Sequence, residues 1–498
     1  MKKYYLGIDQ GTTGTTVLLL DEDWNLISRS YREHTQYYPQ PGWVEHNAVE
    51  IWEKVLEAVK EVIQKAAIHP RDLRCIGLDN QGETVVLWDK SSGLPVYNAV
   101  VWQDRRTSQD ADLISATYGE IIRKKTGLVV DCYFSATKIK WIIDHIPGVK
   151  EKIQSHQICA GTMDSWLIWK LTNGKVFTTD QSTASRTMLF NIHTGDWDNN
   201  LLDIFQIPRE ILPQINDSAS LFGFTDPSIF FDSKVPISGS AVDQQAALFG
   251  QACFTTGSVK TTYGTGCFML MNTGNIPVYS DHGLLTTVAW GLNNHNLTYA
   301  LDGGVYIAGA AVQWLRDKLK IIHSASETAS IAKSVKDSGG VYFVPAFSGL
   351  AAPYWDQYAR GTLLGIVGGT EPAHIVRATL ESIAYQVKDN LDIMIKDSGK
   401  PINLMRVDGG ASVNDFLMQF QADILGIPVD VPVITETTAL GAAYLAAYGI
   451  GDYENLDELS QQWKLQLRYE PKMTSSTRDY LLENWHRAVE RSRNWARP

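Results

Sequence analysis

Hydrophobic and polar positions alternate along the chain in short blocks that are typical of strands, turns and helices. Residues 4–9 (YYLGID) and 16–21 (TVLLLD) are two β-rich runs separated by a Gly/Thr turn, which predicts a hairpin. A helix is predicted next by apolar residues at helical spacing: Ile51, Val55, Val59 and Val62. Asn47 is expected to cap this helix, with Glu50 as its capping-box partner. RCIGLDN and TVVLWD then predict two further strands.

The second half of the chain repeats this opening pattern. Residues 258–274 (SVKTTYGTGCFMLMNTG) again predict strand, Gly/Thr turn and strand. Residues 297–317 and 402–426 each predict a strand, a Gly-rich turn and a helix. We therefore expect an α/β protein made of two similar halves, 1–250 and 251–498, whose boundary lies near 245–258.

The bulk properties exclude several classes of protein. The chain has 498 residues, of which 44% are hydrophobic and 20% charged, which is typical of a globular protein of several domains. Its net charge of −11 argues against a general nucleic-acid partner, and no apolar run approaches the roughly 18–20 residues needed to insert into a membrane. The five cysteines are scattered and form no CxxC pair. We read them as reduced core thiols of a cytoplasmic protein that has no signal peptide.

The last stretch of the chain, residues 477–498, predicts a helix. Leu482, Trp485 and Val489 fall on one helical face. The arginines of this segment could mark a partner site, but we expect a solvated face on a packed terminal helix.

The first Gly/Thr turn has a composition that suits phosphate. Backbone N–H groups of such a turn can point into one concavity and bind an anion, and threonine hydroxyls add donors. Asp9 ends the strand just before the turn, where a carboxylate could hold Mg²⁺. The chain has no GxxxxGK[ST] motif at this position, and no GxGxxG motif follows a strand. A plain hairpin turn is the alternative, but the matching turn at 262–266 favours two hairpins that enclose a nucleotide.

Longer motifs connect these features to a known family. YFSATKIKWIIDH (133–145) and GTLLGIVGGTEPAHIVRATLE (361–381) resemble the two signatures of the FGGY family of carbohydrate kinases. The order of PGWVEHN, VWQDRRT, RTMLFNIHT and AAPYWDQYARG is most similar to the branch that phosphorylates glycerol. The resemblance implies two actin/hexokinase-like (ribonuclease H-like) domains with a nucleotide cleft between them. It also implies ATP and Mg²⁺ as cofactors, a small polyol as substrate, and a homodimer or homotetramer.

The resemblance assigns the catalytic base to Asp243, in AVDQQ. An alcohol is a poor nucleophile until its proton leaves, so phosphoryl transfer needs a carboxylate near the attacking hydroxyl. Asp243 also suits the N-cap of a helix at 244–249, and both roles are compatible. Asp9, alone or together with Asp243, is expected to hold Mg²⁺.

The resemblance also assigns the two binding sets. For the polyol they are Glu83, Trp102, Tyr133, Asp243, Gln244 and Phe268. Taken singly, the two aromatic walls Trp102 and Phe268 would more often be core residues. For the nucleotide they are Thr12, Thr13, Gly14, Thr265, Gly309, Gln313, Gly410 and Asn414. The glycine pair at 409–410 also reads as a strand-to-helix turn that needs positive φ.

Three positions depart from the related kinases. Gly82 stands where they have an arginine beside the pocket glutamate, which is expected to remove charged donors and to empty a large volume. Val242 replaces a glycine before the catalytic aspartate, and Thr16 replaces an arginine after the first hairpin turn. The substrate could thus be a longer polyol such as a tetritol or pentitol, or a ketose such as xylulose. Another side chain or water could instead replace the guanidinium and leave glycerol as substrate. A non-catalytic actin-like scaffold is a further alternative, against which the pocket cluster argues.

Overall fold

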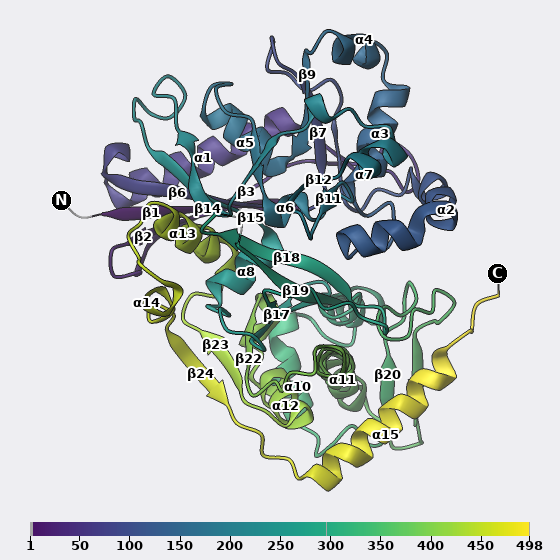
Figure 1. The fold of residues 1–498 in the computed structure, drawn as a ribbon. Helices are drawn as coiled ribbons and strands as arrows, with labels where there is room; N and C mark the ends of the chain where they lie inside the picture. The colour runs from purple at the N-terminus through teal and green to yellow at the C-terminus, as the bar shows by residue number, and fades with distance from the viewer. Residues whose placement is uncertain (1–2, 295, 498) are drawn as a thin grey trace.

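The chain folds around two large sheets that follow one plan. The computed structural model describes residues 3–294 and 296–497. Figure 1 shows the first half of the chain in the upper part of the molecule and most of the second half below it. The strands of the first large sheet lie between residues 4 and 242, and those of the second between 259 and 469. The boundary that we place between residues 250 and 251 stays a prediction.

The strands are β1 (Tyr4–Gln10), β2 (Gly14–Asp21), β3 (Leu26–Glu33), β4 (Gln36–Tyr37), β5 (Glu45–His46), β6 (Leu73–Asn80), β7 (Val85–Asp89), β8 (Ala99–Val100), β9 (Ile158–Thr162), β10 (Thr178–Asp180), β11 (Phe190–Asn191), β12 (Asp196–Trp197), β13 (Gln214–Asn216), β14 (Ala219–Phe224), β15 (Pro236–Val242), β16 (Val259–Tyr263), β17 (Cys267–Gly274), β18 (Leu285–Leu292), β19 (Asn296–Val305), β20 (Tyr342–Val344), β21 (Thr362–Leu364), β22 (Met405–Asp408), β23 (Val429–Pro432) and β24 (Leu465–Tyr469).

The helices are α1 (Ala48–Ala66), α2 (Ser108–Thr126), α3 (Ser135–His145), α4 (Val149–Gln154), α5 (Met163–Leu171), α6 (Gln181–Ala184), α7 (Asn199–Phe205), α8 (Asp243–Gly250), α9 (Gly309–Trp314), α10 (Thr328–Lys333), α11 (Pro372–Ser398), α12 (Asp415–Leu425), α13 (Thr437–Gly449), α14 (Leu456–Ser460) and α15 (Ser475–Ser492), with short 3₁₀ or π turns η1 (Pro70–Asp72), η2 (Arg209–Ile211), η3 (Leu315–Leu319), η4 (Ala325–Glu327) and η5 (Gly410–Val413).

The two large sheets share a strand order when one of them is read in reverse. The first runs β3-β2-β1-β6-β15-β14, and the second runs β18-β19-β17-β16-β22-β23-β24, in which β18 is an additional edge strand. In each, an antiparallel hairpin (β1–β2 or β16–β17) is joined to a parallel strand (β6 or β22). The register places Asp9 beside Asp79 in the first sheet and Thr262 beside Asp408 in the second. The two predicted Gly/Thr hairpins and the duplicated plan are therefore confirmed.

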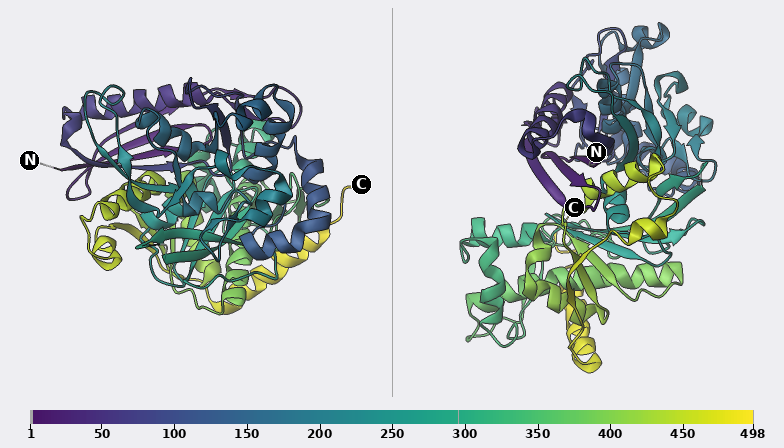
Figure 2. Two further views of the ribbon diagram at one scale, coloured as in Figure 1. Left: turned by 45° about the horizontal axis from the view of Figure 1, so that its top comes forward. Right: turned by 90° about the vertical axis from the view of Figure 1, so that its left-hand side faces the viewer.

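Helix α13 joins the halves, although it belongs to the second half by sequence. It packs on β1, β6 and β15 of the first sheet and on α8. Figure 1 places it beside β1 and β15, and in the right-hand view of Figure 2 its yellow-green ribbon lies within the upper part of the molecule. The approach is between backbones: a Cβ on Gly77 would fall 1.8 Å from the Ala442 carbonyl oxygen, and one on Gly441 would fall 1.8 Å from that of Ala246. Only glycine permits contacts this short.

One detail of the predicted helix start is wrong. Asn47 does cap α1, because its Oδ1 accepts the N–H groups of Val49 and Glu50. Glu50 does not complete a capping box: its carboxylate accepts the backbone N–H and the hydroxyl of Thr35, both at 2.9 Å. Thr35, in the loop between β3 and β4, thus binds the carboxylate that a local pattern assigns to the cap.

The terminal helix and the cysteines behave as predicted. Trp485 and Val489 of α15 are buried in the core of the second half, and Leu482 packs against that core. All five cysteines are buried and free. Within the described residues, none of the helices is both long and apolar enough to cross a lipid bilayer.

Gly441→Ala tests the contact between α8 and α13. Because the new methyl group would overlap backbone that cannot move aside, we expect the free energy of unfolding to fall by about 3 kcal/mol, together with loss of activity. Thermal and denaturant unfolding measure this. Gly368→Ala is the matched control, since nothing lies within 4 Å of the place that its new methyl group would take. An equal effect of the two substitutions would contradict the proposed role of the contact.

Candidate active site

The first hairpin turn is held in shape by the backbone around it. The Gly11 N–H donates to the Gly14 carbonyl, and the Gln36 amide donates to the Thr12 carbonyl at 2.8 Å. A Cβ on Gly14 would meet the Arg32 carbonyl oxygen at 2.6 Å, so a side chain has no room there. Thr12 is half-buried and Thr13 is exposed. The turn is therefore rigid at its base and presents its threonines outward.

The second hairpin turn is tied to the start of α9. The N–H groups of Ala308 and Ala310 both donate to the Thr265 carbonyl. A Cβ on Gly309 would fall 2.5 Å from the Gly264 carbonyl oxygen, which explains the glycine. The structure thus brings Thr265 and Gly309 together. Gln313 lies one turn further along α9 and is exposed.

The glycine pair after β22 lies against the same turn. Gly409 has φ +86°, and a Cβ there would meet the Tyr263 carbonyl oxygen at 2.5 Å. The turn with positive φ that the sequence suggested is therefore confirmed. Gly410 is exposed, with open space where its side chain would be. Asn414 caps α12 through the Leu417 N–H and donates to Thr328, so it has a structural role as well.

Three carboxyl groups converge where the first sheet meets α8. Asp9 and Asp79 lie side by side on the neighbouring strands β1 and β6. Neither carboxyl oxygen of Asp79 has a hydrogen-bond partner among the described residues. Burial raises the pKa of Asp79 well above its usual range, and the charges of Asp9 and Asp243 act in the same direction. Burial also raises the pKa of Asp9 to about 7. Two carboxylates this close cannot both be ionised cheaply, so the pair holds a proton near neutral pH.

Asp243 is the first residue of α8, and Val242 is the N-cap, which corrects the capping position that the sequence suggested. Its carboxylate still accepts the N–H of Gln244 at 2.7 Å. Burial raises the pKa of Asp243, while that N–H and the charge of Lys260 oppose the rise. The aspartate thus sits at a helix start whose N–H groups favour a negative charge.

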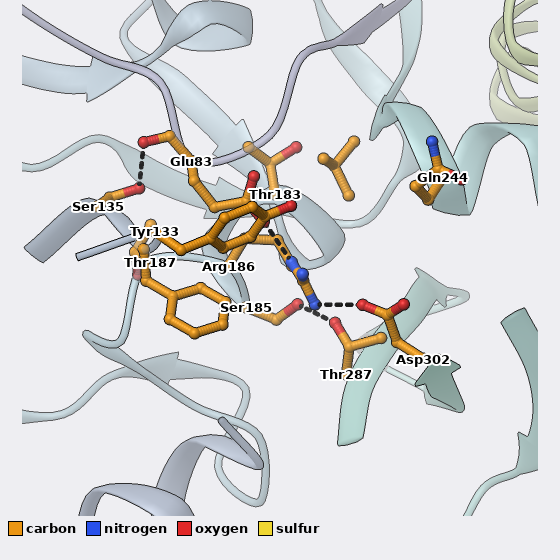
Figure 3. A network of polar contacts seen from close by, with 12 residues as sticks. Glu83, Tyr133, Ser135, Thr183, Ser185, Arg186, Thr187, Gln244, Thr287 and Asp302 are labelled. Carbon is orange, nitrogen blue, oxygen red and sulfur yellow. Dashed lines mark hydrogen bonds and ion pairs between the residues drawn. The ribbon is translucent and has the colours of Figure 1, made fainter. Parts of the chain in front are cut away.

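Glu83 lies in a buried ion-pair network, drawn in Figure 3. Its carboxylate accepts Nε of Arg186 at 2.7 Å, and Nη1 of Arg186 pairs with Asp302 at 3.1 Å. The Glu83 backbone has φ +60°, and its carbonyl accepts the Ser135 hydroxyl. Burial raises the pKa of Glu83 to about 7 against the opposing charge of Arg186. A left-handed non-glycine residue held this firmly is a common feature of functional sites.

The predicted aromatic walls lie in two places. The rings of Trp102 and Tyr133 meet edge to face, with centroids 5.5 Å apart. Trp102 also donates its indole N–H to the Thr12 hydroxyl at 2.8 Å, which connects this wall to the first hairpin turn. Phe268 is half-buried on β17 opposite Gly304 of β19, the strand that carries Asp302.

The space beside Gly82 is filled, contrary to the expectation that the missing arginine empties a large volume. A Cβ on Gly82 would lie 2.7 Å from Cγ2 of Val242, which is buried. The two departures in sequence are thus one packing unit, in which Val242 requires a residue without a side chain at position 82. A guanidinium does reach Glu83 in this pocket, that of Arg186, which follows α6 and belongs to the RTMLFNIHT motif.

Comparison with known proteins shows the family to which the chain belongs. The profile of the "FGGY family of carbohydrate kinases, N-terminal domain" matches residues 4–250, and that of the C-terminal domain matches residues 259–450. The chain belongs to the FGGY family of carbohydrate kinases. It is 55% identical to "Glycerol kinase 2" of Thermotoga maritima over 99% of both chains, and 51% identical to a "Glycerol kinase" of Thermus thermophilus over 98% of this chain and 99% of the other.

Solved structures support the same assignment. A glycerol kinase of Plasmodium falciparum with ADP is 38% identical and superposes with a TM-score of 0.92, covering 99% of this chain and 98% of the other. A xylulose kinase of Lactobacillus acidophilus, 22% identical with a TM-score of 0.86 over 98% of this chain and 97% of the other, shares the fold. This FGGY kinase therefore has the predicted actin/hexokinase-like fold and is an ATP-dependent carbohydrate kinase.

The sequence reasoning missed several charged residues of the site. They are Asp79, Arg186, Lys260, Asp302 and Asp408, all buried or nearly so. All five lie inside segments that were singled out for other reasons: RCIGLDN, RTMLFNIHT, 258–274, 297–317 and 402–426. A charge within a strand that is otherwise apolar was the available signal, because charged side chains are rarely buried without a partner.

Gly82→Ala in this kinase tests the packing unit with Val242. Because the added methyl group would press on a stiff β-branched side chain, we expect a loss of about 1–3 kcal/mol in the free energy of unfolding. The double variant Gly82→Ala/Val242→Ala should be more stable than the sum of the two single effects predicts. Denaturant unfolding of all four proteins gives the coupling. Additive effects would show that the two side chains are independent.

Proposed function

We propose that this kinase transfers the γ-phosphate of ATP to a terminal hydroxyl of a small polyol, with glycerol as the leading substrate and sn-glycerol 3-phosphate as product. The observation that carries the proposal is the position of Asp243. Its charge acts on Glu83 and Tyr133 on one side and on Asp9 and Asp79 on the other. A carboxylate between a polyol pocket and a phosphate site is what alcohol phosphorylation requires. The names of the relatives over nearly the full chain support glycerol.

In the proposed mechanism, Asp243 accepts the hydroxyl proton while the alcohol oxygen attacks the γ-phosphorus. The new O–P bond forms as the bond from the γ-phosphorus to the ADP oxygen breaks, and ADP leaves with that electron pair. Glu83 would accept hydrogen bonds from polyol hydroxyls and Gln244 would donate one. Tyr133 is a further hydroxyl donor, and Trp102 and Phe268 would pack against the carbon backbone.

For the nucleotide we propose that the two hairpin turns hold the phosphates through Thr12, Thr13, Gly14 and Thr265. Gly309, Gln313, Gly410 and Asn414 would contact the rest of the nucleotide. The exposed threonines at both turns and the bare backbone at Gly410 support this placement.

The donor set near Asp9 fits Mg²⁺. Carboxylate oxygens are the ligands that Mg²⁺ prefers, and the unpartnered oxygens of Asp79 favour a nearby cation. Within the described residues, no group of three or more His, Cys, Asp or Glu side chains is arranged to hold a metal ion. Asp9 and Asp243 would thus share the ion with water and phosphate oxygens, as is usual for Mg²⁺. When bound, the ion would neutralise charge on the phosphates. The buried free thiols support a reducing compartment, the cytoplasm.

A substrate panel tests the proposed function. We expect ADP release in the presence of ATP and Mg²⁺ to be stimulated by glycerol more than by erythritol, threitol, arabitol or xylulose, compared by kcat/KM. A higher kcat/KM for one of the other polyols or for xylulose would reassign the substrate and keep the kinase. No stimulation by any of them would support the non-catalytic scaffold.

Asp243→Asn tests the proposed base. We expect phosphoryl transfer to fall by about 10²–10⁴-fold, because the amide cannot take the hydroxyl proton. ATP affinity, measured by calorimetry, should change little. Asp203→Asn, an exposed aspartate on α7, is the control for the same chemical change. Turnover of Asp243→Asn near the wild-type rate would refute the role of the base.

Asp9→Asn tests the proposed Mg²⁺ site. The amide is a weaker ligand than the carboxylate, so the Mg²⁺ concentration for half-maximal rate should rise by roughly tenfold or more. Initial rates over a Mg²⁺ titration at saturating substrate measure the change. An unaltered Mg²⁺ dependence would place the ion elsewhere.

A further inference from the structure

Lys260 is a buried cation to which the proposed mechanism gives no part. It lies on β16 of the second sheet, and its side chain is fully buried. Its Nζ donates to Oε1 of Gln244 at 2.5 Å and to the Thr262 hydroxyl at 2.9 Å. Both of these acceptors are neutral. A buried ammonium group is costly unless its surroundings compensate the charge, so its presence calls for an explanation.

The charges around Lys260 come from several elements. Asp408 of β22, Asp243 of α8 and Asp302 of β19 all favour its charged form. Burial lowers the pKa of Lys260, and these carboxylates oppose that shift. The lysine is thus a cation held among three carboxylates, one of which is the proposed base.

The bond to Gln244 determines which way the Gln244 amide faces. An ammonium group has donors and no acceptor, so only the amide oxygen of Gln244 can face it. The amide NH₂ must then point away from Lys260. Figure 3 shows Gln244 at the start of its helix, across from the network of Glu83, Arg186 and Asp302. Without Lys260 the amide could turn by 180° and present an acceptor instead.

We propose that Lys260 is a positioning residue, which holds the Gln244 amide so that its NH₂ donates to an oxygen of the bound polyol. This inference rests on the proposed function. The contact joins a strand of the second sheet to a helix that follows the first sheet, so it also ties the polyol pocket to the half that carries the second phosphate turn.

A purely structural role is the competing explanation, and kinetics separate the two. Lys260→Met keeps an unbranched buried side chain but lacks the donor. If Lys260 positions Gln244, the KM for glycerol should rise by about tenfold or more, since a hydrogen bond in a buried site is lost, while the KM for ATP changes less than about twofold. Lys260→Gln can still donate to the Gln244 carbonyl, so it should recover part of the effect.

A double-variant cycle makes the test specific. Gln244→Met removes the amide itself, and Lys260→Met/Gln244→Met should then have a glycerol KM no higher than Gln244→Met alone. Thr262→Val removes the other acceptor of Lys260 and should leave the glycerol KM within about threefold of wild type. Circular dichroism and thermal unfolding of each variant show whether it is folded.

The outcomes separate this inference from the proposed function. If the wild-type protein shows no polyol-stimulated ADP release, the proposed function fails before any variant is made. If the wild type is active but Lys260→Met leaves the glycerol KM unchanged, the positioning role is overturned. It is also overturned if the effects of Lys260→Met and Gln244→Met add independently, or if Thr262→Val raises the glycerol KM as much as Lys260→Met does.

Discussion

Backbone-to-backbone packing between α8 and α13 is the constraint on which the arrangement of this kinase depends. A Cβ on Gly250 would fall 2.0 Å from the Thr437 carbonyl oxygen, and a Cβ on Gly441 would fall 1.8 Å from the Ala246 carbonyl oxygen. Because α13 also lies on β1, β6 and β15, this contact fixes α8 against the first sheet as well as against the second half. Asp243 is the first residue of α8, so the same contact decides where the proposed base stands. Glycine here gives up helix propensity, and the packing that it permits offsets that cost.

The duplicated plan uses one strand position in two different ways. Asp79 lies next to the end of β6 and Asp408 ends β22, the equivalent parallel strand, each beside its hairpin. Asp408 is satisfied by Gln251 and Thr437, both at hydrogen-bond distance, and so it joins segments of the second half. Among the residues that the structure describes, neither carboxyl oxygen of Asp79 has a hydrogen-bond partner, although Asp9 lies beside it on β1. The same topology therefore gives a structural carboxylate in one half and a cluster of acidic groups in the other, where a bound proton or cation would compensate the negative charge.

The surroundings of Glu83 show how two substitutions fit together. Gly82 and Val242 occupy a single volume, so neither departure from the related kinases stands alone. Glu83 is paired with the guanidinium of Arg186, about a hundred residues further along the chain, and Arg186 also pairs with Asp302 of the second half. A buried network of this kind is stable only when each charge is paired, which limits how the pocket can vary.

The sequence by itself determined the class of this protein. The two Gly/Thr hairpins, the strand-turn-helix units and the buried face of the last helix were all readable, because turn chemistry and side-chain periodicity are local properties. Asp9 and Asp243 became candidates through their motifs, and their roles stay predictions. What only the tertiary structure decided are the contacts between distant segments: Thr35 takes the carboxylate of Glu50, Val242 fills the space beside Gly82, and Lys260 orients Gln244. Periodicity says that a residue is buried, but the partner of a buried group depends on how the sheets and helices pack, which no local pattern records.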